Sequence, residues 1–371
     1  MNKTTEKIRV SASFEPLHLK FKFDAGTSRG VLQEKHNYLL RIRSDTYPGL
    51  VGIGEAGPLV GLSLDDRKDF RACLQQVCDG LQGVAFSTDP DMILKEVAAL
   101  VLEGLPSIRF ALETALLDLI HGGRRRIFPN RFFDNQVPIP INGLVWMGEV
   151  EFMERQIEEK LAAGFSCIKM KIGAIDFDTE YHLLKKVRKR YRKEEITLRV
   201  DANGAFSPED ALTKLEKLSA LDLHSIEQPI GQGQWEEMAK LCAHSPVPIA
   251  LDEELIGIFD EAEKSKLLAN VMPAFIILKP TLLGGIYETT TWIRLAEEKG
   301  IGWWMTSALE SNVGLNAIAQ FTATFESEMP QGLGTGQLYH NNIDSPLLVR
   351  AGYLWYDAEK RWANIPGGEI N

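Results

Sequence analysis

The sequence predicts an α/β protein, a modified (β/α)8 barrel of the TIM type that follows a smaller N-terminal α+β domain. Three observations predict this fold. The chain has 371 residues, which is too long for one simple core and favours one large domain with a smaller one. Its first part has the pattern of strands followed by helices. From "VPIPINGLVW" onward, short strand-like segments alternate with helical ones, as in a barrel.

The predicted N-terminal domain covers residues 1–125. Residues from 8 to about 53 alternate polar and apolar side chains, which indicates a meander of antiparallel strands. Two helical stretches follow, "SLDDRKDFRACLQQVCDGL" and "SIRFALETALLDLIHGG". The second begins after Pro106 with Ser107 as the expected N-cap, and it ends at Gly122 and Gly123.

The predicted barrel covers residues 126–335, and we expect the C-terminal segment 336–371 to return to the N-terminal domain. Helical segments such as "EVEFMERQIEEKLAAG" and "GIYETTTWIRLAEEKG" fill the gaps between strands. An irregular start or end of the barrel also fits the pattern. The eight expected strands lie at residues 139–144, 167–172, 197–201, 225–227, 249–252, 275–278, 302–305 and 332–334.

Polar residues recur at the ends of these strands, where a barrel carries its active site. They follow one another at intervals of 25 to 30 residues, about the length of one strand, one helix and two loops. A single acidic residue at a strand end is more often a helix cap or an ion-pair partner than a ligand. Six polar residues in phase with the repeat are much harder to obtain by chance. The six are Lys171, Asp201, Glu227, Asp252, Lys279 and Ser307.

Three of the six are carboxylates on adjacent strands, Asp201, Glu227 and Asp252. Clustered carboxylates raise one another's pKa unless a cation lies among them. Oxygen ligands without a nearby histidine or cysteine favour Mg²⁺ or Mn²⁺ over zinc. Lys169 and Lys171 share one face of "CIKMK", and burying both is costly unless they project into a mouth that holds anions and a metal. An exposed edge strand with solubilising lysines is the alternative.

Three neighbouring residues are candidates for substrate contacts or for orienting the ligands. Arg199 and Asn203 flank Asp201, and Arg199 lies two residues back on the same strand face. Glu253 is expected to form an ion pair with Lys279 and so to orient it. A routine hydrogen bond within the barrel is the alternative for each of them.

The composition narrows the class of protein. The net charge of −10 and the pI near 5.4 argue against a general nucleic-acid-binding surface, but not against a local pocket for a small anion.

The four cysteines form no CxxC pair, so we expect reduced thiols. No apolar stretch has the length of a signal or membrane segment, and we expect a soluble cytoplasmic protein without membrane partners. The arginines at 124–126 favour a solvated loop. A homo-oligomer stays open.

The motifs "KMK", "VDANGAF", "IEQP", "ALDEE", "LKP" and "SALESNVG" resemble those of the enolase superfamily, in its muconate-lactonizing-enzyme-like subgroup. The resemblance spans nearly the whole chain, because "GVLQEKHNYLLRI" and "GIGEAGPLVGLS" look like the superfamily's N-terminal capping domain. It implies that Asp201, Glu227 and Asp252 bind Mg²⁺ and that Lys171 and Lys279 face each other across the substrate. The shared step is removal of a proton α to a carboxylate, giving an enediolate that the metal stabilises.

Within the superfamily, "TSALESNVGLNAIAQF" and "QGLGTGQLYHNNIDSPL" resemble the o-succinylbenzoate synthase group of menaquinone biosynthesis. That resemblance implies a hydro-lyase that dehydrates 2-succinyl-6-hydroxy-2,4-cyclohexadiene-1-carboxylate, a small anionic carboxylate, to 2-succinylbenzoate. Lys171 is then the base that removes the C1 proton and, as an ammonium, assists departure of the hydroxyl group. Lys279 stays protonated and stabilises the enediolate.

Two other activities of the superfamily are alternatives. Dipeptide epimerases typically carry an Asp-x-Asp pair near the eighth strand to hold an ammonium group, whereas this sequence has "GLGTGQ" there. Gly334 and Thr335 suit an uncharged or anionic group better, which favours the synthase. N-acylamino acid racemisation remains open, because its substrate also lacks a free ammonium. In the N-terminal domain, Ser28, Arg29 and "PLVGLS" resemble loops that close over substrate, although a surface arginine is the simpler interpretation of Arg29.

Hypotheses from other classes fit less well. A metal-stabilised scaffold or binding protein would have no catalytic role for Lys171. Mg²⁺-dependent phosphoryl transfer would favour a phosphate-binding GxxxxGK[ST] loop, and the sequence has none.

Overall fold

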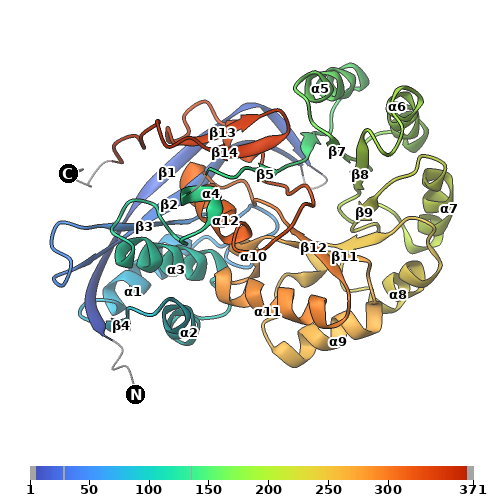
Figure 1. The fold of residues 1–371 in the computed structure, drawn as a ribbon. Helices are drawn as coiled ribbons and strands as arrows, with labels where there is room; N and C mark the ends of the chain where they lie inside the picture. Colours follow the sequence, from blue (N-terminus) through green and yellow to red (C-terminus); the bar gives the residue numbers. More distant parts are fainter. Residues whose placement is uncertain (1–5, 28–29, 135, 366–371) are drawn as a thin grey trace.

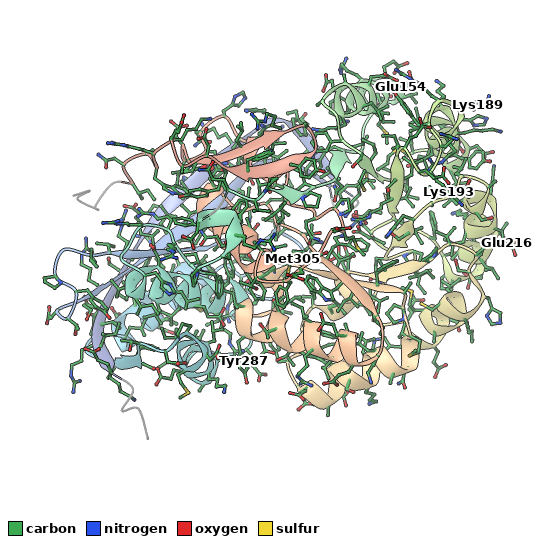
Figure 2. All side chains as sticks on the ribbon, in the orientation of Figure 1. Glu154, Lys189, Lys193, Glu216, Tyr287 and Met305 are labelled. Carbon is green, nitrogen blue, oxygen red and sulfur yellow. The ribbon has the colours of Figure 1, made fainter. Side chains whose placement is uncertain are left out.

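The structure is a computed structural model that describes residues 6–27, 30–134 and 136–365. An antiparallel sheet with its helices packs beside a curled parallel sheet, and helices α5 to α9 follow one another around the outside of the parallel strands (Figure 1). Charged side chains such as Glu154, Lys189, Lys193 and Glu216 lie at the outer rim of this helical layer, whereas Met305 lies inside on β12 (Figure 2).

The N-terminal sheet has the strand order β3-β2-β1-β4, and its neighbouring strands are antiparallel, which confirms the predicted meander. Gly52 and Gly54 let helix α3 approach β3 closely: a Cβ atom at Gly54 would lie 1.9 Å from the carbonyl oxygen of Ala111. The strands are β1 (Lys7–Thr27), β2 (Gly30–Ser44), β3 (Gly52–Ala56) and β4 (Ala85–Ser87); the helices are α1 (Phe70–Gly80), α2 (Pro90–Leu100) and α3 (Pro106–Ile120). Strand β4 and helix α2 are additions to the predicted pattern of strands followed by two helices.

The start of α3 differs from the prediction. The N-cap position is Leu105, and Ser107 is the second residue of the helix. The cap comes instead from Asp65, whose Oδ2 accepts hydrogen bonds from the Ser107 backbone N–H at 2.8 Å and from its hydroxyl at 2.6 Å. A carboxylate from a preceding loop therefore satisfies the helix end, a contact that local sequence does not encode.

The barrel sheet consists of seven parallel strands in the order β12-β11-β10-β9-β8-β7-β6. The strand predicted at 139–144 is divided near Asn142: its first part pairs with the C-terminal hairpin and its second part enters the barrel. The strands are β5 (Ile139–Pro140), β6 (Gly143–Val145), β7 (Cys167–Lys171), β8 (Thr197–Asp201), β9 (Ser225–Glu227), β10 (Ile249–Leu251), β11 (Phe275–Leu278) and β12 (Gly302–Met305).

Residues 332–334, all described, form no strand, so the short eighth strand predicted there is wrong, whereas the irregular end that the pattern also allowed is present. Single bridges from Gln331 to Ile141 and from Gly332 to Thr306 close the barrel instead. On the β12 side the Gly332 N–H donates to the Met305 carbonyl at 2.8 Å. Pro330 lacks a backbone donor and the glycines add no side chains to pack, which keeps this pairing short.

Helices cover the outside of the barrel, and several begin at the residue types that favour an N-cap: Asp176, Ser207 and Asp260 each accept a hydrogen bond from a backbone N–H of the first turn. The elements are α4 (Arg131–Asp134), α5 (Val150–Ala162), α6 (Phe177–Arg190), α7 (Pro208–Ser219), α8 (Trp235–His244), η1 (Glu253–Leu255), α9 (Glu261–Val271), α10 (Pro280–Leu283), α11 (Gly285–Glu298), α12 (Asn312–Thr322) and η2 (Thr335–Gln337).

The C-terminal segment contacts both parts. Its hairpin, β13 (Leu347–Arg350) and β14 (Tyr353–Tyr356), pairs with β5. Just before it, the His340 N–H donates to the Lys20 carbonyl of β1 at 2.9 Å. The domain boundaries 1–125, 126–335 and 336–371 stay predictions. Cys73, Cys78, Cys167 and Cys242 are free thiols. Among the described residues, no helix is long and apolar enough to cross a membrane.

Replacing Asp65 by alanine tests the cap of α3. The variant leaves the buried Ser107 N–H and hydroxyl without their acceptor, which we expect to lower the free energy of unfolding by about 1–3 kcal/mol. Urea unfolding followed by circular dichroism measures the loss. Asp45→Ala is the control, because Asp45 is an exposed aspartate outside the helix cap and should change stability by no more than about 0.5 kcal/mol. Equal losses in the two variants would contradict the assignment of the cap.

Candidate active site

The strand register brings the predicted charged residues together. Lys171 on β7 pairs with Asp201 on β8, and Asp201 pairs in turn with Glu227 on β9. Asp252 directly follows β10 and Lys279 directly follows β11, so both lie at the same end of the sheet. Strand β7 has β6 on one side and β8 on the other, which rules out the exposed edge strand as the reason for the two lysines.

The lysines and carboxylates form a buried ion-pair cluster. The ammonium of Lys169 bridges Asp201, at 3.1 Å, and Glu227. That of Lys171 contacts the same Asp201 carboxylate at 3.0 Å, and Lys279 pairs with Asp252. Lys169 and Lys171 are only 5% and 9% exposed, so these contacts lie out of water, where ion pairs are strongest and unpaired charges most costly.

Burial and charge act against each other on the pKa values of this cluster. Burial, reinforced by the charges of Asp201 and Asp252, raises the pKa of Glu227 to about 7 despite Lys169. Burial also works to raise the pKa of Asp201, but Lys169 and Lys171 hold it far below its usual value. Although burial opposes it, the charge of Asp252 raises the pKa of Lys279, which keeps this group an ammonium.

The three carboxylates fit a divalent metal ion. One oxygen from each of Asp201, Glu227 and Asp252 lies within 4.8 Å of the others. Among the described residues, the buried Oε1 of Glu227 has no hydrogen-bond donor, so one oxygen of the cluster lacks a partner. A set of hard oxygen donors suits Mg²⁺ or Mn²⁺, whose charge would relieve the repulsion that raises the pKa of Glu227.

A cavity of about 480 Å³ opens onto this cluster. Its charged side contains Lys169, Lys171, Asp201 and Lys279. Its lining also includes apolar residues, which a pattern of polar strand ends does not reveal. These are Leu32, Leu144, Trp146, Leu309 and Leu338. The loop "PLVGLS" contributes Leu59, Val60 and Gly61, whereas Ser28 and Arg29 lie outside the described residues.

Asn203 orients Lys171 on the charged side of the cavity. Its Oδ1 accepts a hydrogen bond from the Lys171 ammonium at 2.7 Å, and its Nδ2 donates to Glu253 at 3.0 Å. Glu253 thus contacts Asn203, the partner of Lys171, and its charge also raises the pKa of Lys279, whose ammonium pairs with Asp252.

Ser307, Gly334 and Thr335 line the cavity near the barrel closure. The Thr335 hydroxyl donates to the Ser307 hydroxyl oxygen at 2.8 Å, and Ser307 donates to Glu310 at 2.5 Å. Arg199 does not line the cavity. It is fully buried inside the barrel, with its guanidinium 3.9 Å from the ring centre of Trp304.

Comparisons with known proteins agree with this geometry. Residues 152–359 match the model of the enolase C-terminal domain-like family. The chain is 49% identical over 366 residues to an o-succinylbenzoate synthase of Desulfotalea psychrophila. The aligned region covers 93% of this chain and 98% of the synthase. The crystal structure of MenC from Desulfotalea psychrophila LSv54 matches with a TM-score of 0.80 at 44% identity, covering 93% of this chain and 99% of that one.

A more distant structure shows the same fold. A dipeptide epimerase from Enterococcus faecalis V583, complexed with Mg and the dipeptide L-Leu-L-Tyr, matches with a TM-score of 0.81 at 19% identity. The match covers 96% of this chain and 98% of that one. The predicted barrel with an N-terminal capping domain is therefore confirmed.

A metal-binding measurement tests the carboxylate cluster. Isothermal titration with Mn²⁺ should show one site, and Glu227→Gln should weaken it at least about 100-fold, because the variant removes one anionic ligand. Glu254→Gln is the matched control, since Glu254 is equally buried at this end of the barrel but hydrogen-bonds to Gln228 and Gly233. Unchanged affinity in Glu227→Gln would show that the cluster is only an ion-pair network.

Proposed function

We propose a reaction for this chain on the premise that it belongs to the enolase superfamily, as its matches show. The reaction is the dehydration of 2-succinyl-6-hydroxy-2,4-cyclohexadiene-1-carboxylate to 2-succinylbenzoate. This is the o-succinylbenzoate synthase reaction of menaquinone biosynthesis, and it makes the protein a hydro-lyase. The observation that carries the proposal is the 49% identity to such a synthase along nearly the whole chain. The buried lysines and carboxylates supply the groups that the reaction needs.

Lys171 is the proposed base. Acting as the neutral amine, it takes the proton from C1, and the electron pair moves into the neighbouring carboxylate to form an enediolate. When the enediolate collapses, the C6–O bond breaks and Lys171, now an ammonium, returns the proton so that the hydroxyl leaves as water. The ring becomes aromatic, which drives the step forward. The contacts of Lys171 with Asp201 and Asn203 support this role, because they fix the direction of the amine.

Lys279 is the proposed cationic partner. It follows β11, with three strands between it and Lys171 on β7, so the two groups belong to different sides of the barrel mouth. The Asp252 carboxylate favours its ammonium form, and a fixed ammonium stabilises the negative charge that develops on the substrate.

Mg²⁺ is the proposed cofactor, with Mn²⁺ as a substitute, and Asp201, Glu227 and Asp252 are its proposed ligands. When bound, the ion supplies positive charge for the substrate carboxylate and lowers the barrier to loss of the α proton. The magnesium complex of the structurally similar dipeptide epimerase supports this choice.

The lining of the cavity supports an anionic substrate rather than a dipeptide. Near Ser307, Gly334 and Thr335 the cavity offers hydroxyl and backbone groups, and the Glu310 carboxylate, which accepts a hydrogen bond from Ser307, is not among the residues that line it, so this part of the lining suits a substrate ammonium poorly. N-acylamino acid racemisation, which uses the same half-reaction, is the activity against which the proposal is tested. The cytoplasmic location and the oligomeric state stay predictions.

The direct test is turnover. Purified protein with Mg²⁺ should consume the cyclohexadiene carboxylate, seen as loss of its diene absorbance, and a chelator should abolish the reaction until Mg²⁺ is restored. N-acylamino acids and dipeptides in D₂O are the comparison, and deuterium should enter their α position far more slowly. Folded, metal-loaded protein that leaves the diene intact would refute the synthase. Rapid exchange into N-acylamino acids would then identify a racemase.

A further inference from the structure

One wall of the substrate cavity is held in an unfavourable backbone conformation. Ser307, Ala308 and Leu309, which follow β12, line the cavity. Leu309 has a φ of 65°, in the left-handed region that residues with a Cβ atom rarely adopt. Such a conformation costs on the order of 1–3 kcal/mol and persists only when surrounding contacts impose it.

Contacts with this wall come from distant parts of the chain. The Tyr339 hydroxyl donates to the Leu309 carbonyl at 2.7 Å. From the capping domain, the ammonium of Lys35 donates to the Ala308 carbonyl at 2.9 Å. Lys35 lies on β2, where it pairs in register with Leu19 of β1, and it is only 3% exposed.

The surroundings of Lys35 act on its charge in opposite directions, and burial is the stronger influence. Burial lowers the pKa of Lys35, but the carboxylates of Glu310, Glu55 and Asp65 act in the opposite direction. Glu310 does not line the cavity but supports the same wall, because its carboxylate accepts hydrogen bonds from Ser307, at 2.5 Å, and from Thr281. Thr281 lies two residues after Lys279, so the wall is also linked to the segment that carries the proposed cationic partner.

We propose that Lys35 is a positioning residue that sets the shape of the substrate cavity. Its ammonium ties the capping sheet to the Ala308 carbonyl and thereby holds Leu309 against the cavity. Without it, residues 307–309 relax towards ordinary backbone angles and the wall no longer fits the substrate. The inference rests on the proposed function for the identity of that substrate, but the conformation of the wall can be measured without it.

The test compares Lys35→Met with Arg41→Met. Arg41 is the matched control, because it is a buried cation on the same strand, 4% exposed. It pairs with Glu15 and does not line the cavity. Both variants should lower thermal stability. Only Lys35→Met should raise KM for the diene and Kd for 2-succinylbenzoate at least about tenfold, with kcat within about threefold, because one buried charged hydrogen bond is lost while the reacting groups stay. Lys35→Arg should restore most of the affinity.

Hydrogen exchange gives a second readout that needs no substrate. Amide protons of residues 306–311 should exchange at least about tenfold faster in Lys35→Met than in the wild-type protein, and at the wild-type rate in Arg41→Met. Equal exchange in both variants, or an affinity loss that Arg41→Met reproduces, would overturn the proposal. A wild-type protein without turnover would count against the proposed function alone, because the exchange comparison would still decide the role of Lys35.

Discussion

The ammonium of Lys169, bridging the carboxylates of Asp201 and Glu227, is the centre of a charge cluster on which the rest of the site depends. Lys171 and Lys279 add two ammonium groups and Asp252 adds a third carboxylate, so three amino groups meet the three carboxyl groups in the barrel mouth. Removing one partner of such a buried pair leaves an uncompensated charge, which is far more costly than the pair itself is favourable. The parallel register enforces the arrangement: Lys171, Asp201 and Glu227 end neighbouring strands, and Lys169 lies two residues before the end of β7.

Buried carboxylates also join the capping domain to the barrel. Glu55 of β3 accepts hydrogen bonds from the N–H groups of Ser311 and Gly314 at the start of α12. Glu113 of α3 accepts one from Tyr287 in the first turn of α11, at 3.1 Å. Each carboxylate is fully buried and lies where a helix presents free N–H groups and positive potential.

The hydrogen bonds of Glu55 and Glu113 join the capping domain to the part of the barrel that completes the cavity. Helices α11 and α12 follow β11 and β12, whose ends carry Lys279 and Ser307. Lys35 adds a contact to the cavity wall itself. The capping domain is therefore joined to the residues that surround the substrate through polar groups that must each be satisfied, and a shift of the domain would leave several of them unpaired.

The sequence predicts the features that follow the period of the barrel. Lys171, Asp201 and Glu227 could be placed at one mouth because strands of similar length repeat at a regular interval. Features that depend on contacts between distant segments could not be predicted. The cap of α3 comes from Asp65, 42 residues before Ser107. Lys35 belongs to a strand in which nothing local distinguishes it from a surface lysine.

The closure of the barrel and the buried Arg199 show a second limit on what the sequence can predict. The segment after Pro330 alternates in the manner of a strand, yet single bridges to its two neighbours replace a ladder. Arg199 shares a strand face with Asp201, which suggests a place at the site. Its guanidinium instead packs on the ring of Trp304 inside the barrel, an arrangement that depends on a side chain from β12. Strand periodicity gives the face of a residue but not its partner across the barrel.

The assignment of Lys171 as the base is tested most directly by the turnover of Lys171→Ala. Binding of metal and of product is measured in the same preparation. We expect kcat for dehydration to fall by at least about 1,000-fold, because the base is lost, while Mn²⁺ and 2-succinylbenzoate still bind. If Lys171→Ala, folded and metal-loaded, keeps a kcat within tenfold of the wild-type value, another group removes the proton and the assignment of Lys171 is wrong.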